Sequence, residues 1–343
     1  MIPNSVFLKA CRREPTEYTP IWLMRQAGRY LSEYRAMREK ASFLAMCKTP
    51  DLAVEVTLQP IKRMRMDAAI IFADILLPLE PMGIKLEFSQ GEGPIIHNPI
   101  QKETDIKNLR IIEPEEDTPF VLEAIKKVVK ELNSMIPVIG FAGGPFTLAS
   151  YCIEGGHSQN FIKTKQLMYH NQKYWHLFME KLSTVVTRYL NAQIAAGAEV
   201  IQVFDSWVGC LSTHDYAQFV LPHAQEVFQG LSHDVPAIHF ATGAAHLLEL
   251  MKTAGGDIIG VDWRVELGHA WKRLGYNVGI QGNLDPVTLF APITVIKERV
   301  QNILKSAENR PGHIFNLGHG ILPQTPVENV VALVNMVHDL SRR

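Results

Sequence analysis

Residues 20–38 read PIWLMRQAGRYLSEYRAMR. This stretch passes from a predicted buried strand through a polar turn to a predicted helix, and the same order of elements recurs along the chain. The apolar run (21–24) stops at Arg25, a glycine turn follows, and Arg29 and Arg38 come next. A buried strand that ends among guanidinium groups can bind anions, because each planar fork grips a carboxylate or phosphate through two hydrogen bonds. The stretch therefore predicts a strand that opens into an anion-binding turn.

A solvated helix face that carries arginine is the alternative interpretation, and it is typical of charged runs. It suits Arg35 and Arg38, which lie farther along the predicted helix. Arg25 and Arg29 are harder to explain in this way, because they lie at the mouth of an apolar strand. The formal net charge of the chain is -1, so the arginines form a local cluster in a nearly neutral protein.

The chain has 343 residues, which is long for one ordinary domain but within the range of a single α/β barrel. Its near-neutral charge argues against nucleic acid or an anionic membrane as a partner. Four cysteines without CxxC spacing indicate reduced thiols rather than a disulfide framework. The sequence shows no signal peptide and no membrane-spanning run, so we expect a cytoplasmic protein.

Short apolar runs recur, each followed by polar or glycine-rich residues and then by a segment of helical periodicity. Such runs are typical of parallel strands covered on both faces. Eight alternations predict an α/β fold of the (β/α)8 type, the TIM barrel. An open doubly wound sheet is the alternative, and it is disfavoured because no GxGxxG motif follows a first strand. The predicted strands are 20–24, 68–73, 137–142, 200–204, 236–241, 258–261, 277–281 and 313–317.

One segment departs from this alternation. IKLEFSQGEGPIIHNPI (84–100) indicates an extended, hairpin-like excursion that turns at Gly91-Glu92-Gly93. The sequence contains no linker, low-complexity stretch or internal repeat. We therefore expect one domain over residues 1–343, made of the barrel, an N-terminal extension and this excursion.

The residues that follow the predicted strands would lie together, because the carboxyl ends of barrel strands face the active site. This set is mostly polar and contains few metal ligands at useful spacing. In chain order it consists of Arg25, Asp74, Gly143-Gly144, Asp205-Ser206, Thr242, Asp262, Asn283 and His319.

Asp74 lies within FADILLPLE (72–80), in apolar surroundings where a charge must be paired or used in function. A salt bridge to Arg25 or Arg29 is as favourable an explanation as a contact with substrate, and both can hold at once.

GFAGGPFTLASYCIEGGHS (140–158) has small residues at a strand end and a proline that begins a helix. This pattern fits an anion-binding helix terminus or simply tight packing. Tyr151 follows on the helix, and Gly155-Gly156 suits a hinge. Ser206 and His319 invite a hydrolase interpretation, but the chain has no GxSxG elbow, so we favour hydrogen bonds to a substrate.

MRQAGRY (24–30) and GFAGGPFTLASYCIEGG (140–156) closely resemble the two signature segments of the uroporphyrinogen decarboxylase family. DAAIIFADIL (67–76), IQVFDSWVG (201–209) and FNLGHGILP (315–323) resemble its remaining strand-end blocks. The resemblance implies a (β/α)8 barrel that works as a cytoplasmic homodimer without metal or organic cofactor. It also implies an activity, the removal of four acetate carboxyl groups in turn from uroporphyrinogen III, giving coproporphyrinogen III and CO₂ in haem biosynthesis.

The same resemblance implies roles for individual residues. Arg25 and Asp74 match the catalytic positions, and Asp74 would bind the pyrrole N–H groups at the centre of the macrocycle. One difference is Asp205, where some relatives carry glutamate, and we attach no functional weight to it. The residues implied to bind substrate are Arg25, Gln26, Arg29, Arg38, Asp74, Tyr151, Phe204, Ser206 and His319.

The implied chemistry fits these residue types. Decarboxylation needs an electron sink for the pair that CO₂ leaves behind, and a pyrrole ring protonated on carbon supplies one without a cofactor. Asp74 would stabilise the cationic ring as a preorganised anion. The proton donor stays open between Arg25, a bound water, a substrate carboxyl and another side chain, because a guanidinium is a very weak acid.

Two other functions compete with this one. A zinc-dependent, cobalamin-linked methyltransferase has a related barrel but needs a His-x-Cys pair, whereas this chain has His239-Phe240-Ala241. A non-catalytic tetrapyrrole-binding protein would bind the macrocycle and release no CO₂. The complete set of polar strand-end residues argues against this second alternative.

Overall fold

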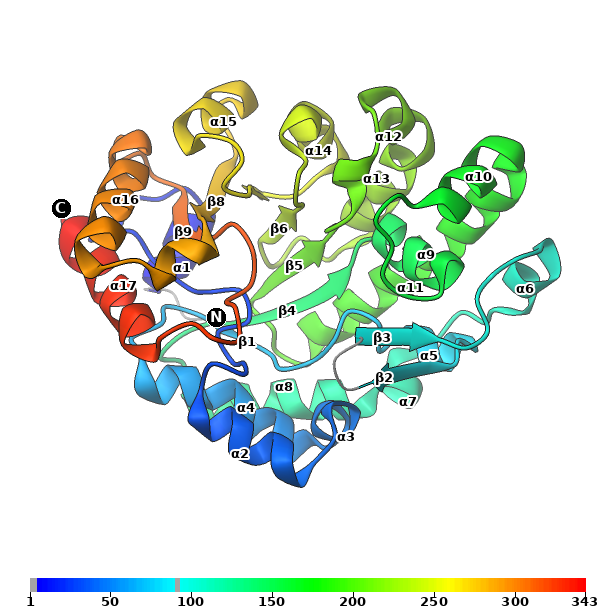
Figure 1. The fold of residues 1–343 in the computed structure, drawn as a ribbon, viewed down its shortest axis with the longest axis horizontal. Helices are drawn as coiled ribbons and strands as arrows, with labels where there is room; N and C mark the ends of the chain where they lie inside the picture. Colours follow the sequence, from blue (N-terminus) through cyan, green and yellow to red (C-terminus); the bar gives the residue numbers. More distant parts are fainter. Residues whose placement is uncertain (1–4, 90–92) are drawn as a thin grey trace.

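The structure is a computed structural model that describes residues 5–89 and 93–343. Its centre is a curled, fully parallel sheet in the order β1-β4-β5-β6-β7-β8-β9 (Figure 1). Seven of the predicted strands are confirmed, and their residues are almost all buried, as expected for strands covered on both faces. They are β1 Ala69–Ile70, β4 Val138–Gly143, β5 Val200–Phe204, β6 Ala237–Phe240, β7 Ile258–Gly260, β8 Gly279–Leu284 and β9 His313–Leu317.

The predicted strand 20–24 is not formed as a strand. It is represented only by an isolated parallel bridge between Ile21 and Phe315. Side chains capture its backbone N–H groups, because that of Ile21 donates to Asp67 Oδ2 (2.7 Å) and that of Met24 donates to Asn316 Oδ1 (3.1 Å). A regular ladder cannot continue once these donors are taken.

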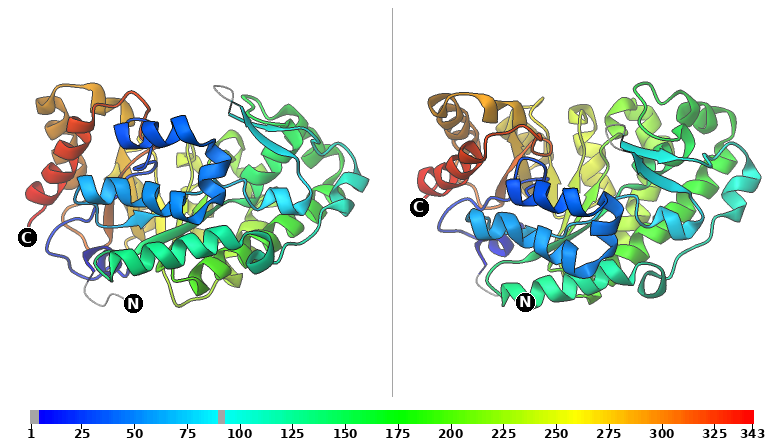
Figure 2. Two further views of the ribbon diagram at one scale, coloured as in Figure 1. Left: turned by 90° about the horizontal axis from the view of Figure 1, so that it is seen from below. Right: turned by 60° about the horizontal axis from the view of Figure 1, so that its bottom comes forward.

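Helices surround the sheet on its outer side (Figures 1 and 2). The apolar face of α11 (Gln172–Ala195) is buried against β4, α9 and α13. The helices are α1 Val6–Cys11, α2 Ser32–Lys40, α3 Phe43–Lys48, α4 Pro50–Arg63, α5 Leu79–Met82, α6 Glu103–Asn108, α7 Pro114–Asp117, α8 Pro119–Leu132, α9 Pro145–Glu154, α10 Ile162–His170, α11 Gln172–Ala195, α12 Thr213–Phe219, α13 Leu221–Gly230, α14 Leu248–Ala254, α15 Leu267–Leu274, α16 Ile293–Ser306 and α17 Val327–Leu340, with 3₁₀ turns η1 Val208–Cys210, η2 Ala245–Leu247 and η3 Pro286–Phe290.

The excursion near residue 90 forms the predicted hairpin, with β2 (Leu86–Ser89) antiparallel to β3 (Gly93–Ile96). Of its predicted turn, residues 91 and 92 lie outside the described part of the chain. The N–H of Ile96 donates to the carbonyl of Gly155 (2.9 Å), so the hairpin is attached to the end of α9. Gly155 ends that helix in the left-handed conformation (φ 88°), which glycine adopts at little cost.

Polar side chains also occupy the interior of the sheet. Trp22 Nε1 donates to Gln281 Oε1 (2.9 Å), and Gln281 Nε2 donates to Gln202 Oε1 (3.1 Å). These bonds tie the segment 21–24 to β8 and β5. Within the described residues, no helix is long and apolar enough to span a membrane.

Candidate active site

The turn that carries Arg25 is held by its neighbour Gln26, whose side chain is fully buried. Gln26 Oε1 accepts from the N–H of Leu23 (3.1 Å), and its Nε2 donates to the carbonyl of Ala68 (3.1 Å), just before β1. Tyr30 Oη donates to the carbonyl of Gln26 (2.7 Å). These bonds maintain Arg25 at φ 60°, a left-handed conformation that non-glycine residues rarely adopt.

Arg25 itself follows the segment 21–24 and is exposed. Its aliphatic part runs over Gly320, where an added Cβ would lie 2.4 Å from Arg25 Cδ. Glycine at position 320 therefore leaves room for the Arg25 side chain to cross the loop after β9.

The two further arginines lie near Arg25. Burial raises the pKa of Tyr34, and the positive charges of Arg38, Arg29 and Arg25 oppose this rise, so all three lie around one ring. Arg29 is exposed, and Arg38 is half-buried with one N–H on the carbonyl of Ala41 (2.7 Å). The three guanidinium groups therefore all lie within electrostatic reach of Tyr34.

Arg35 has a different role from these three. Its Nη1 donates to the carbonyls of Arg29 (2.9 Å) and Tyr30 (3.0 Å). The guanidinium of Arg35 thus braces the backbone of the turn that presents Arg29.

Asp74 follows β1 and is partly exposed toward the strand ends. Its Oδ1 accepts from the N–H of Leu76 (2.9 Å). Desolvation raises the pKa of Asp74 to about 6, although the bond from Leu76 and the charge of Arg25 pull it down. Among the described residues no basic side chain forms a salt bridge with Asp74, so the ion pair considered from the sequence is not present. The carboxylate is left available to a ligand.

Tyr151 and Trp207 form an aromatic wall beside Asp74. Their ring centroids are 3.9 Å apart, with the planes tilted by 31°. Burial raises the pKa of Tyr151 to about 12, Asp74 contributes to the rise and Arg25 opposes it, so the phenol lies near both charges. Thr147, one turn before Tyr151, donates to Asp205 Oδ1 (2.9 Å) and accepts from the N–H of Trp207 (3.3 Å).

Phe204 and Ser206 follow each other closely at the end of β5. The Phe204 ring makes edge-to-face contacts with Phe141 (centroids 5.5 Å apart) and Phe240 (5.9 Å), and it remains partly exposed. Ser206 is also partly exposed, and its carbonyl accepts from Thr242 Oγ1 (2.6 Å). The pair offers an apolar surface next to a hydroxyl.

His319 lies in the loop after β9. Its Nδ1 accepts from the N–H of Gly320 (2.8 Å), a bond that assigns the proton of the neutral ring to Nε2. Burial lowers the pKa of His319, and the positive charge of Arg25 lowers it further. His319 therefore presents a neutral N–H donor to the site.

Of the predicted residues, Asp74, Tyr151 and His319 lie within electrostatic reach of Arg25, as does Tyr34. The amide of Gln26, in contrast, is used within the fold. Its predicted contact with substrate stays a prediction. Chemically, the arrangement combines cationic groups for carboxylates, neutral N–H and O–H donors, and one carboxylate that can face a cation.

Two features were missed in the sequence: Trp207 stacks on Tyr151, and Thr147 bridges two elements. Asp205, expected at the strand ends, is buried, and its Oδ2 has no hydrogen-bond partner within the described part of the chain. Desolvation raises the pKa of Asp205 to about 7. The order Phe204-Asp205-Ser206-Trp207 directly after a strand was a usable signal for Trp207, whereas the role of Thr147 depends on a contact between distant elements.

The described residues include no group of three or more His, Cys, Asp or Glu side chains placed to hold a metal ion. His239, the position compared with zinc sites, is buried in β6 against Phe228, and burial lowers its pKa to about 4. Its Nδ1 faces the carbonyl of Met251 (3.3 Å). These contacts give His239 a place in the core.

Comparison with solved structures identifies the fold. A methyltransferase from Methanosarcina mazei is similar with a TM-score of 0.80 at 20% sequence identity, covering 96% of each chain. A B12-independent methionine synthase from Shewanella sp. W3-18-1 is similar with a TM-score of 0.57 at 11% identity, covering 84% of this chain and 87% of that one. Fold and site together define a parallel α/β protein with an arginine-rich polar site at the carboxyl ends of its strands.

Comparison of sequences is more specific. A family model described as uroporphyrinogen decarboxylase (URO-D) matches residues 2–340. The uroporphyrinogen decarboxylase of Carboxydothermus hydrogenoformans is 60% identical over 339 residues, which is 98% of this chain and 97% of that protein. That of Sorangium cellulosum is 55% identical over 98% of this chain and 96% of that protein. The chain belongs to the uroporphyrinogen decarboxylase family.

Proposed function

We propose that this protein removes the four acetate carboxyl groups of uroporphyrinogen III in turn, giving coproporphyrinogen III and CO₂ in haem biosynthesis. Family membership supports this function, and one observation carries the assignment of the site. Asp74 is a carboxylate without a salt bridge among the described residues, and it lies near both Arg25 and Tyr151 at the strand ends. A site of this kind suits a polyanion whose centre becomes positively charged.

The reaction replaces each acetate carboxylate by a proton. Protonation of a pyrrole carbon makes the ring cationic, the bond from the acetate CH₂ to the carboxyl carbon then breaks, and its electron pair neutralises the ring as CO₂ leaves. A second proton adds to the exocyclic carbon to form the methyl group, and the proton on the ring is lost. Asp74 would bind the pyrrole N–H groups and stabilise the cationic ring electrostatically.

The remaining residues would bind and orient the macrocycle. Arg25 would hold the acetate that reacts, and Arg29 and Arg38 would hold peripheral carboxylates by charge-assisted hydrogen bonds. Further polar contacts would come from Tyr151, Ser206 and His319, an apolar ring contact from Phe204, and support of the Arg25 turn from Gln26. No metal or organic cofactor takes part in this scheme.

We also infer that the sheet closes into a (β/α)8 barrel through the segment 20–24, within one domain over residues 1–343. Hydrogen bonds on both sides of this segment support the closure. The N–H of Phe315 in β9 donates to the carbonyl of Pro20 (2.8 Å), and the N–H of Asp67, before β1, donates to the carbonyl of Ile21 (2.9 Å).

For the assembly we propose a homodimer in the cytoplasm, as the resemblance to the family implies, with neither nucleic acid nor membrane as a partner. The net charge of -1 supports the second part, since a strongly basic surface is the usual mark of such partners. Light scattering at several protein concentrations tests the dimer, and a constant monomer mass would contradict it.

The test of the function is an anaerobic assay in which uroporphyrinogen is incubated with the purified protein and the products are separated by chromatography. We expect CO₂ release and stepwise conversion to coproporphyrinogen, unchanged after dialysis against a chelator. Binding of the macrocycle without CO₂ release would leave the non-catalytic alternative. Activity that disappears on dialysis and returns with Zn²⁺ would favour the methyltransferase-like alternative.

A further inference from the structure

The loop after β7 holds a fourth arginine at the same end of the sheet. Asp262 is buried, its Oδ1 accepts from the backbone N–H of Arg264 (3.0 Å), and its Oδ2 accepts from the N–H of Gly243 (2.6 Å) and from Arg264 Nη1 (2.5 Å). The guanidinium of Arg264 also lies 4.1 Å from the centroid of the Trp263 ring. An arginine fixed by both a carboxylate and an aromatic ring loses little entropy when it binds an anion.

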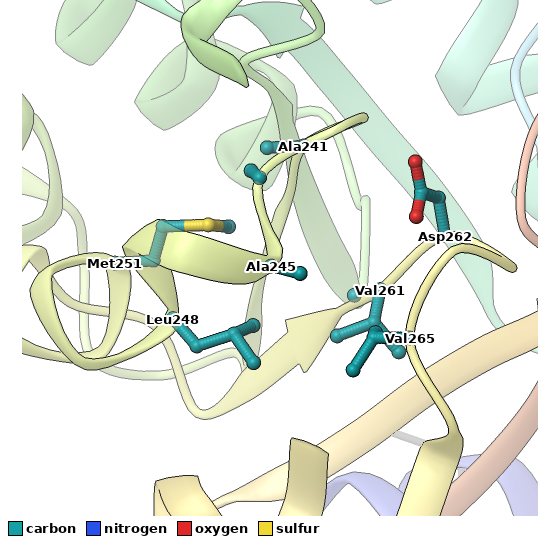
Figure 3. A pocket seen from close by; sticks show the side chains of 9 residues that line it. Ala241, Ala245, Leu248, Met251, Val261, Asp262 and Val265 are labelled. Carbon is teal, nitrogen blue, oxygen red and sulfur yellow. The ribbon is translucent and has the colours of Figure 1, made fainter. Parts of the chain in front are cut away.

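The loop that carries this arginine is firmly supported. Asn283 Nδ2 donates to the carbonyls of Asp262 (2.8 Å) and Val265 (2.7 Å). Beneath the loop lies an apolar cavity of about 10 Å³, roughly the space of one water and too small for a ligand. In Figure 3 the carboxylate of Asp262 projects away from the side chains of Val261 and Val265 that line this cavity. The carboxylate of Asp262, with its partner Arg264, therefore lies on the side of the loop opposite these valines.

Two glycines place this loop beside the site described above. An added Cβ at Gly318 would lie 2.5 Å from the backbone nitrogen of Trp263, and one at Gly320 would lie 2.4 Å from Arg25 Cδ. His319 is thus held between the β7 loop and Arg25. Its pKa reflects this position, because after burial the positive charges of Arg25 and Arg264 both lower it.

The guanidinium retains donors for a ligand. The side chain of Arg264 is 53% exposed, and across residues 5–89 and 93–343 the only hydrogen bond recorded for its guanidinium is that from Nη1 to Asp262. Figure 1 places α15, which follows Arg264, across the molecule from α2, which carries Arg38. A macrocycle with eight carboxylates presents anions on all sides, so a cationic group is needed on this side as well.

We propose that Arg264 binds a carboxylate of the tetrapyrrole substrate, on the side of the site away from Arg29 and Arg38. The inference rests on the proposed function and extends it by a specificity-determining residue. The alternative is a purely structural ion pair that fixes the loop. The two roles differ once the charge of Asp262 is removed. A purely structural Arg264 then has no further function, whereas an Arg264 that binds substrate still contributes to KM.

The chain supplies a matched control in Arg310. This arginine also pairs with a carboxylate two residues earlier, Glu308, and its guanidinium lies 4.0 Å from the centroid of an aromatic ring, that of Tyr276. It precedes β9 and therefore lies at the opposite end of the sheet from the site. Arg310→Gln thus removes the same kind of interaction away from the substrate.

The experiment measures KM and kcat for anaerobic decarboxylation of uroporphyrinogen by the wild type, Arg264→Gln, Arg310→Gln and the double variant Asp262→Asn/Arg264→Gln. We expect KM to rise about three- to tenfold in both variants that lack Arg264, with kcat nearly unchanged, because a partly exposed charge-assisted hydrogen bond is lost. Arg310→Gln should keep the wild-type KM. Added salt should raise KM less in Arg264→Gln than in the wild type.

The double variant keeps the test valid if Arg264→Gln folds poorly, because it leaves no unpaired buried charge. A KM in the double variant equal to that of Arg310→Gln would overturn the proposal and assign Arg264 to the structural ion pair. Failure of the wild type to release CO₂ from uroporphyrinogen is a separate result that would overturn the proposed function, and with it the proposal for Arg264.

Discussion

The indole of Trp207 stacks on the phenol of Tyr151 with ring centroids 3.9 Å apart, joining the loop after β5 to helix α9. The ring of Phe161 also contacts the indole, with centroids 5.1 Å apart. Thr147 fixes the same junction by bonding to both Asp205 and the backbone of Trp207. The position of the Tyr151 hydroxyl therefore depends on a residue outside its own helix.

Trp207→Leu should lower kcat/KM about tenfold while the protein stays folded. The stacking of two aromatic rings contributes roughly 0.5–1.5 kcal/mol beyond burial, and its loss frees the Tyr151 ring to leave its position. Steady-state kinetics together with thermal unfolding would measure both effects. Tyr151→Phe is the control, since it keeps the stack and removes only the hydroxyl. Wild-type kinetics in Trp207→Leu would show that the wall has no part in catalysis.

Asp74→Asn should keep the fold and lose most of the turnover. An amide does not replace a charge that faces a developing cation, and the loss of one preorganised electrostatic element costs on the order of 10²–10³ in rate. Single-turnover measurements of CO₂ release would isolate this step. Turnover near that of the wild type would remove Asp74 from the mechanism.

The pH profile should report the same group. Because desolvation raises the pKa of Asp74 to about 6, the ionised form predominates above that pH and is lost as pH falls through it. We expect kcat/KM to fall on the acid side with a midpoint near pH 6. We assign this midpoint to Asp74, so His319→Gln, which removes the imidazole and leaves Asp74 in place, should keep it. A midpoint that disappears in His319→Gln would assign the titration to the histidine.

Much of the fold follows from local pattern, because a strand covered on both faces must be apolar throughout. This is why β4, β5 and β9 could be predicted from runs of five or six residues. The segment 20–24 has the same pattern but differs in hydrogen bonding. The N–H groups of Ile21 and Met24 bind the side chains of Asp67 and Asn316, and no local pattern reveals such distant partners.

The site was predictable where it depends on strand ends. Asp74, Ser206 and His319 follow predicted strands, and a parallel sheet brings such positions to one edge. Trp207 and Arg264 were missed because their positions depend on contacts across elements, a ring stack in one case and a buried carboxylate in the other. The sequence therefore indicates which residues lie at the carboxyl edge of the sheet, and packing determines how each side chain is oriented.

Arg29→Ala and Arg38→Ala should mainly weaken substrate binding, whereas Arg25→Ala should also slow the chemical step. Arg29 and Arg38 are partly or largely exposed, so each loss should raise the dissociation constant roughly tenfold, the lower end for charge-assisted hydrogen bonds. Arg63→Ala is the control, because its guanidinium is bound to Glu33 on the outer surface (2.7 Å). If the affinity for substrate is unchanged in the Arg29 and Arg38 variants, these two arginines are ordinary solvated charges.

Gly320→Ala should lower turnover without unfolding the protein. The added methyl would lie 2.4 Å from Arg25 Cδ, and a flexible side chain can move aside, so the guanidinium would be displaced. Misplacing a substrate-binding group by about 1 Å can cost up to about 10²-fold in rate.

Gly318→Ala is the contrasting variant, because its methyl would meet the backbone nitrogen of Trp263 at 2.5 Å. Backbone cannot move aside as easily, and we expect a loss of stability of about 1–3 kcal/mol there.

Asp205→Asn should change how stability depends on pH. Burial raises the pKa of Asp205 from 3.8 to about 7, so between these values the folded state binds a proton that the unfolded state does not. The wild type therefore loses stability as pH rises from about 4 to 7, and Asp205→Asn escapes this loss, which amounts to at most roughly 4 kcal/mol. The stability of the variant relative to the wild type should rise over this window and level off above it, as measured by urea unfolding at each pH.

Thr147→Val tests the cause, because removing the donor to Oδ1 should raise the pKa of Asp205 further and extend the window to higher pH. A difference between Asp205→Asn and the wild type that stays constant from pH 4 to 8 would mean that the buried carboxyl does not titrate there.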